Sequence, residues 1–158
     1  MYNTINMNTS KEYLAGLFDG EGCVWISKNI WHKSSTGKFT NPVYSLNCSI
    51  NMTHKGIIEN LHNSFGGCFN AHNHKNINHA TLYSWIIASR KAKSFLELIL
   101  PYTIVKREQI VLGLEFQTHI DNIGRTWTRT KGLTQDILKL RESYRQRLKA
   151  LKINTQHI

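Results

Sequence analysis

The stretch LAGLFDGEG, residues 14–22, decides the fold of this chain. Thr9 and Glu12 precede it with the spacing of a capping box, and the residues that follow have helical apolar spacing, so we expect a helix that starts at about residue 10 and ends near residues 20–22. Glycines 20 and 22 then permit a turn, which leaves residue 21 just past the helix. Gly16 and Gly20 make one helix face nearly bare, and such a face suits close packing against a second helix.

The remaining elements follow an order that excludes a parallel, doubly wound sheet. Alternation and β-branched residues predict strands at about 23–31, 45–52, 68–74 and 81–89. Helical spacing predicts helices at about 55–64, 90–99, 102–119 and 134–152, with Pro101 at a break and a basic loop at 122–132. This order predicts an α+β fold with an αββαββα core, a four-stranded antiparallel sheet, helices on one face and an additional C-terminal helix.

The composition favours a nucleic acid as the partner. The chain has 158 residues and a formal net charge of +10, and its 41% hydrophobic content is high enough for one globular core. We expect a single domain over residues 10–152, with flexible ends at 1–9 and 153–158. A basic excess of this size points to a polyanion, because Lys and Arg neutralise phosphates.

Other classes of protein are disfavoured. No run approaches the roughly 18 apolar residues of a membrane helix, and the first ten residues lack the layout of a secretory signal, so we expect an intracellular protein without a membrane partner. The three cysteines are widely spaced, which supports neither a disulfide framework nor a cysteine zinc site. Abundant Asn and Ile suggest an AT-rich genome, so an organelle is favoured over a bacterial cytoplasm.

The opening stretch resembles the signature of the LAGLIDADG homing endonucleases. Phe18, Gly20 and Glu21 are its departures from that signature, and Glu21 keeps the acid. The resemblance continues in THK (53–55) and PYTIVKREQ (101–109), and it covers about residues 11–116. It implies a saddle-shaped sheet and an intron-encoded, site-specific endonuclease that cuts double-stranded DNA and has no small-molecule substrate.

The resemblance also implies a catalytic site. Glu21, with the backbone carbonyl of Gly20, would hold a divalent cation, Mg²⁺, that activates water. His54 falls at the position that orders water near the scissile phosphate, and Lys106 at that of the basic residue that stabilises phosphate charge. Outside this context each of these residues could equally be a solvated surface group.

The motif occurs once, whereas cleavage of both strands needs two sites, so a homodimer is expected. The predicted interface on the first helix consists of Leu14, Ala15, Gly16, Phe18 and Asp19. Strands of about 10–12 residues span about 35 Å, so a dimer would cover a pseudo-palindromic site of about 20 base pairs. By resemblance, the products carry short 3′ overhangs.

Polar side chains at alternating strand positions are the candidates for reading base edges in the major groove. They are Trp25, Ser27, Asn29, Trp31, Ser45, Asn47, Ser49, Asn51, Asn70, His72 and His74, and the register of the second strand pair also leaves Tyr83 and Trp85 open. In the basic loop, Arg125, Arg129 and Lys131 are candidates for phosphate contacts.

Two alternatives remain beside this interpretation, and one apparent motif is set aside. A non-cleaving nucleic-acid binder of the same fold, such as an intron-splicing maturase, is the main one. The tripeptide HNH at 72–74 has no weight, because the nucleases of that name are defined by dispersed residues. A zinc site is conceivable, but it lacks standard finger spacing; its ligands would be Cys68, His72, His74 and His79.

Overall fold

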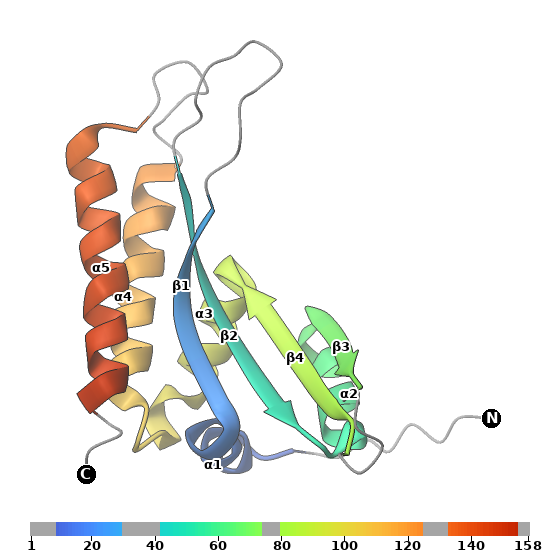
Figure 1. Ribbon diagram of the computed structural model, residues 1–158. Coiled ribbons are helices and arrows are strands. Elements are labelled where there is room, and N and C mark those ends of the chain that lie inside the picture. Colours follow the sequence, from blue (N-terminus) through green and yellow to red (C-terminus); the bar gives the residue numbers. More distant parts are fainter. Residues whose placement is uncertain (1–8, 30–41, 74–79, 125–132, 155–158) are drawn as a thin grey trace, which may run out of the picture.

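The structure of the chain is a computed structural model that describes residues 9–29, 42–73, 80–124 and 133–154. Its helices and strands follow the predicted order along the chain (Figure 1). They are α1 (Lys11–Glu21), β1 (Gly22–Asn29), β2 (Val43–Met52), α2 (Lys55–Phe65), β3 (Cys68–His72), β4 (Leu82–Ala88), α3 (Ser89–Ile99), the short 3-10 helix η1 (Leu100–Tyr102), α4 (Arg107–Gly124) and α5 (Gln135–Asn154).

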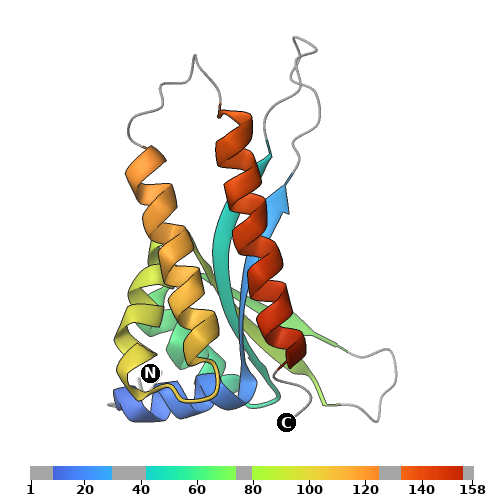
Figure 2. The same ribbon diagram turned by 90° about the vertical axis from the view of Figure 1, so that its left-hand side faces the viewer.

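The four strands form one antiparallel sheet in the order β1-β2-β4-β3, which confirms the predicted fold class. Val24, Leu46 and Ile87 are buried on the face that the helices cover, and Phe18, Phe95 and Phe116 reach the same core from α1, α3 and α4. Turning the molecule shows α4 and α5 standing side by side, with α1 crossing the end of the sheet (Figure 2). The other face of the sheet carries no described helix, and we call it the open face.

Three helix boundaries differ from their predictions. α1 continues through Glu21, so this residue is the last of the helix and does not lie beyond it. α4 begins at Arg107 and not near residue 102, because Pro101 lies in the 3-10 turn η1 and Thr103 has an extended backbone. The same helix runs on to Gly124, into the segment predicted to be a loop.

Among the described residues, none of the helices combines the length and the apolar character that crossing a membrane requires.

Trp85 and Tyr83 face the core, so the expectation that they lie with the base-reading residues is wrong. The register pairs Asn70 with Ser84, and it therefore puts Trp85 on the opposite face. Trp85 is fully buried, and its Nε1 donates a hydrogen bond of 2.8 Å to the carbonyl of Gly66. Tyr83 packs its ring against Phe69 on the same side. Burying a large aromatic side chain such as that of Trp85 stabilises the fold, so the aromatic residues of β4, and not its polar ones, determine which face of the strand points to the core.

Glu142 anchors α5 to the edge of the sheet. Its carboxylate accepts a 2.7 Å hydrogen bond from the hydroxyl of Tyr44, and it lies 3.1 Å from the ammonium of Lys28 and 2.8 Å from the guanidinium of Arg145. Burial alone would raise the pKa of Glu142. The hydrogen bonds from Tyr44, Gln146, Lys28 and Arg145 outweigh burial and lower the pKa to about 2.

This depressed pKa predicts an acid-dependent loss of stability. Because protonation of Glu142 is easier in the unfolded chain, its stabilising effect is fully present above the ordinary value of 4.5 and is lost as the pH falls toward 2. Urea unfolding of the wild type and of Glu142→Gln should give a difference in unfolding free energy that is constant above about pH 5.5 and shrinks below about pH 4.5. A difference that does not change with pH would contradict this role.

Candidate functional site

α1 passes into β1 without a connecting residue, and this junction fixes the direction in which Glu21 points. The N–H of Gly22 caps the helix by donating to the carbonyl of Phe18. A Cβ at position 22 would lie 2.4 Å from both the carbonyl oxygen and a ring carbon of Phe18, so only glycine fits. Glu21 therefore lies exposed at the end of α1, where its carboxylate can bind a ligand from outside the core.

Asp19 holds the connector before α4 on the end of α1. Its carboxylate accepts hydrogen bonds from the backbone N–H groups of Ile104, Val105 and Lys106, at 2.8, 3.2 and 2.9 Å. Three amides that converge on one carboxylate form an anion cap at the start of a helix. Asp19 was expected at a dimer interface; the structure adds this contact within the chain, and the interface role stays a prediction.

Lys106 is brought beside the same end of α1. Its ammonium donates a hydrogen bond to the backbone carbonyl of Asp19. Burial lowers the pKa of Lys106, and the nearby charge of Lys152 lowers it further, whereas Asp19, Cys23 and Glu21 raise it without reversing the direction. The structure therefore brings together two of the three predicted catalytic residues, Glu21 and Lys106.

His54 has a structural contact of its own. It is the N-cap residue of α2, and its Nδ1 accepts a hydrogen bond of 3.3 Å from the N–H of Ile57. Because Gly22 pairs with Ile50, the end of β2 that leads to His54 lies at the same end of the sheet as Glu21. The side chain is exposed there, so the cap leaves its other ring nitrogen available.

The two faces of α1 have different surroundings. Leu14, Ala15 and Phe18 are buried in the chain's own core, so the expectation that they form a dimer interface is wrong. They face the sheet because they are the apolar side of an amphipathic helix. Gly16 and Gly20 lie on the other side, and a Cβ at either would meet nothing within 4 Å. The bare side of α1 is thus open to another molecule.

The donor set at Glu21 fits a hard divalent cation but is small. A carboxylate and the carbonyl of Gly20 are oxygen ligands of the kind that Mg²⁺ and Ca²⁺ bind. No cluster of three or more acidic, His or Cys side chains suited to a metal occurs within the described part of one chain. A complete cation site at Glu21 therefore needs further oxygen ligands, which a second chain or a phosphate can supply.

The open face of the sheet carries most of the predicted base-reading side chains. Asn47 donates to the hydroxyl of Ser27 at 3.0 Å, so two neighbouring strands share one polar patch. Ser49 is an exception: it is only 4% exposed, so its hydroxyl offers little surface for a contact with a base. The register places on this face Trp25, Ser27, Asn29, Ser45, Asn47, Asn51, Asn70 and His72.

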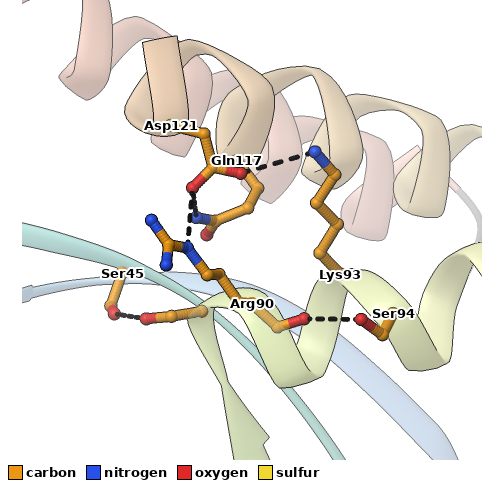
Figure 3. A network of polar contacts seen from close by, with 7 residues as sticks. Ser45, Arg90, Lys93, Ser94, Gln117 and Asp121 are labelled. Carbon is orange, nitrogen blue, oxygen red and sulfur yellow. Dashed lines mark hydrogen bonds and ion pairs between the residues drawn. The ribbon is translucent and has the colours of Figure 1, made fainter. Parts of the chain in front are cut away.

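A polar network supports one end of this face. Ser45 on β2 lies 3.0 Å, hydroxyl to hydroxyl, from Ser89, which begins α3 with an unusual positive φ of 53°. On the same helix, Arg90 and Lys93 each lie 3.4 Å from the carboxylate of Asp121 on α4 (Figure 3). These contacts connect β2 to α3 and α3 to α4 at this end of the sheet.

Several predicted contacts lie outside the described residues and stay predictions. For reading bases these are Trp31 and His74, and for binding phosphate they are Arg125, Arg129 and Lys131. Two of the four ligands of the alternative zinc site, His74 and His79, are outside as well.

The cap formed by Asp19 yields a stability prediction. Asp19→Ala removes a charged acceptor from three amides, so the free energy of unfolding should fall by about 1–3 kcal/mol in urea titrations. Asp19→Asn keeps one oxygen acceptor and should lose less. Asp136→Ala, which removes an acidic residue from the first turn of α5, is the matched control and should cost under about 1 kcal/mol. Equal losses for Asp19→Ala and the control would refute the capping role.

Comparisons with known proteins agree with this geometry. The sequence model of a family described as LAGLIDADG endonuclease matches residues 14–109, more than half of the chain. No curated protein matches the sequence. Among solved structures, the fold resembles the homing endonuclease I-CvuI in complex with the I-CreI target, at 16% identity and a TM-score of 0.65 over 89% of this chain and 80% of that one.

Two further solved structures have a similar fold. The archaeal intron-encoded homing endonuclease I-Vdi141I, complexed with DNA, has 16% identity and a TM-score of 0.64 over 89% of this chain and 82% of that chain. The I-LtrWI LAGLIDADG homing endonuclease, bound to its target DNA, has 19% identity and a TM-score of 0.59. That match covers 89% of this chain but only 44% of the I-LtrWI chain.

Proposed function

The chain belongs to the LAGLIDADG endonuclease family, and on that premise we propose that it is a site-specific homing endonuclease acting on double-stranded DNA. The observation that carries the proposal is the placement of Glu21 and Lys106 together at the end of α1. A carboxylate for a cation and an ammonium for a phosphate are the two groups that metal-dependent phosphodiester hydrolysis requires. An intron-encoded protein of an organelle is the setting we propose.

We propose a homodimer that is paired through the bare side of α1. Gly16 and Gly20 leave room for a second helix at close distance, and exposed apolar side chains border them. Tyr13, Ile104 and Val105 are 47%, 84% and 58% exposed, which is high for large apolar side chains. The match to under half of the I-LtrWI chain also supports an enzyme that needs two copies of this fold.

In the dimer, each chain would contribute one Glu21 and one Gly20 carbonyl to divalent cations at the helix pair. A bound Mg²⁺ would supply an activated water and a counter-charge for the phosphate. The structures of I-CvuI in the presence of Mg and of Ca support a divalent cation of this kind. Lys106 would stabilise negative charge on the phosphate, and the second ring nitrogen of His54 would orient water.

The open face would lie in the major groove. Amide and hydroxyl groups on β1, β2 and β3 can pair with base edges, and DNA-bound I-Vdi141I and I-LtrWI support this use of the fold. Two such faces would cover a pseudo-palindromic site of about 20 base pairs. Paired active sites across the minor groove would leave short 3′ overhangs.

Plasmid cleavage tests the assignment of Glu21. The substrate is a supercoiled plasmid that carries the two sequences flanking the gene, joined without the gene. With Mg²⁺, the wild type and the control Glu97→Gln should linearise it, because Glu97 lies exposed on α3 and is not one of the residues of the candidate site. Glu21→Gln should cut at least about a hundredfold more slowly, because it lacks the charge that holds the cation.

The outcomes separate the enzyme from its alternatives. A wild type that binds this plasmid and never cuts it would favour the non-cleaving, maturase-like binder. Undiminished cutting by Glu21→Gln would mean that another residue holds the cation. Loss of cutting in Glu97→Gln as well would show that charge or folding, and not the site, had been disturbed.

A further inference from the structure

A basic groove runs between the edge strand β1 and the last helix, α5. It encloses about 240 Å³. Its walls come from one strand and one helix that are far apart in the sequence, and Glu142 holds the two together. The lining residues are Trp25, Ile26, Ser27, Arg145, Leu148, Lys149 and Lys152.

The charges in this groove are only partly neutralised. Arg145 is already engaged with Glu142, at 2.8 Å. Lys149 is exposed, and the ammonium of Lys152 donates to the thiol sulfur of Cys23 at 3.0 Å. Because a thiol is a weak acceptor, that contact leaves the positive charge of Lys152 uncompensated. Within the described residues, neither Lys149 nor Lys152 forms an ion pair with a carboxylate.

The groove is continuous with the open face and leads toward the candidate active site. Trp25 and Ser27 belong to both surfaces, because β1 is the edge strand and their side chains point to the open face. Lys152 marks the other end, since its partner Cys23 lies only two residues after Glu21. Lys152 is also close enough to lower the pKa of Lys106, although burial is the larger cause. A polyanion seated on the open face would therefore pass along the groove.

We propose that the groove between β1 and α5 binds the phosphate backbone of the DNA, with Lys149 and Lys152 as its contacts. This inference rests on the proposed function, because it takes the DNA on the open face as given. The two lysines lie about one helical turn apart, roughly 4.5 Å along the helix axis, so they can reach neighbouring phosphates of one strand. They fix the position of the strand near Glu21 without reading its sequence.

Salt-dependent binding tests the proposal. The probe is a fluorescently labelled random-sequence duplex of about 30 base pairs, bound without divalent cations at about 50–200 mM salt, so that only backbone contacts are measured. The variants are Lys149→Gln, Lys152→Gln and their double. Arg147→Gln is the matched control, because Arg147 lines the separate groove between α4 and α5.

Removing one phosphate contact should reduce the log–log slope of affinity against salt by about 0.9. A dimer carries each substitution twice, so each single variant should reduce the slope by about 1.8 and the double variant by about 3.6. Arg147→Gln should leave the slope unchanged. The inference is overturned if the lysine variants and the control change the slope equally. A wild type that binds no duplex at all would instead count against the proposed function itself.

Discussion

The contact between the carboxylate of Asp19 and the backbone amides of residues 104–106 is the interaction on which the candidate site depends. It joins two segments that lie more than 80 residues apart in the sequence. Because the amides belong to the connector just before α4, the contact sets where that helix begins and brings Lys106 to the end of α1. Glu21 is two residues further on, so the anion cap brings the two charged groups of the proposed chemistry to the same end of α1.

α1 has a second constraint, which comes from its two faces. Leu14, Ala15 and Phe18 bind the helix to its own sheet, so the helix cannot rotate to offer them to a partner. The glycine side is what remains for a partner, and it carries no side chains that would hold two helices apart. A single chain therefore has a complete core but an incomplete surface. This difference between the buried apolar side and the bare glycine side of α1 explains how a small domain can be stable and still need a second copy for its proposed chemistry.

Much of this arrangement could be predicted from the sequence, because simple periodicities determine it. Alternation placed the polar residues of β1 and β2 on one face correctly, since the buried inward positions, such as Val24, Ile26 and Leu46, are apolar. Trp85 was predicted to lie on the base-reading face because its strand mixes polar and aromatic residues. The alternating residues Tyr83, Trp85 and Ile87 are nevertheless apolar, and this pattern indicates that they face the core. The start of α4 was misplaced because the Asp19 contact overrides the helical pattern after Pro101.

Other features have no local signal at all. The groove between β1 and α5 combines residues about 120 positions apart, and only the packing of α5 against the edge strand shows which of its many basic side chains face the sheet. The interface side of α1 was likewise ambiguous, because Ala15 and Gly16 are both small and only the position of the sheet distinguishes them. Residues that act through tertiary contacts are thus the part of a site that periodicity predicts least well.

The central claim is that the bare glycine side of α1 pairs two chains, and sedimentation equilibrium of the wild type beside Gly16→Leu tests it most directly. A Cβ at position 16 meets no atom within 4 Å in its own chain, so the variant should fold normally while its leucine side chain blocks the close approach of a second helix. The account predicts a mass of about twice 18.3 kDa for the wild type and a single chain of 18.3 kDa for the variant. A monomeric wild type, or a dimer that Gly16→Leu leaves intact, would contradict it.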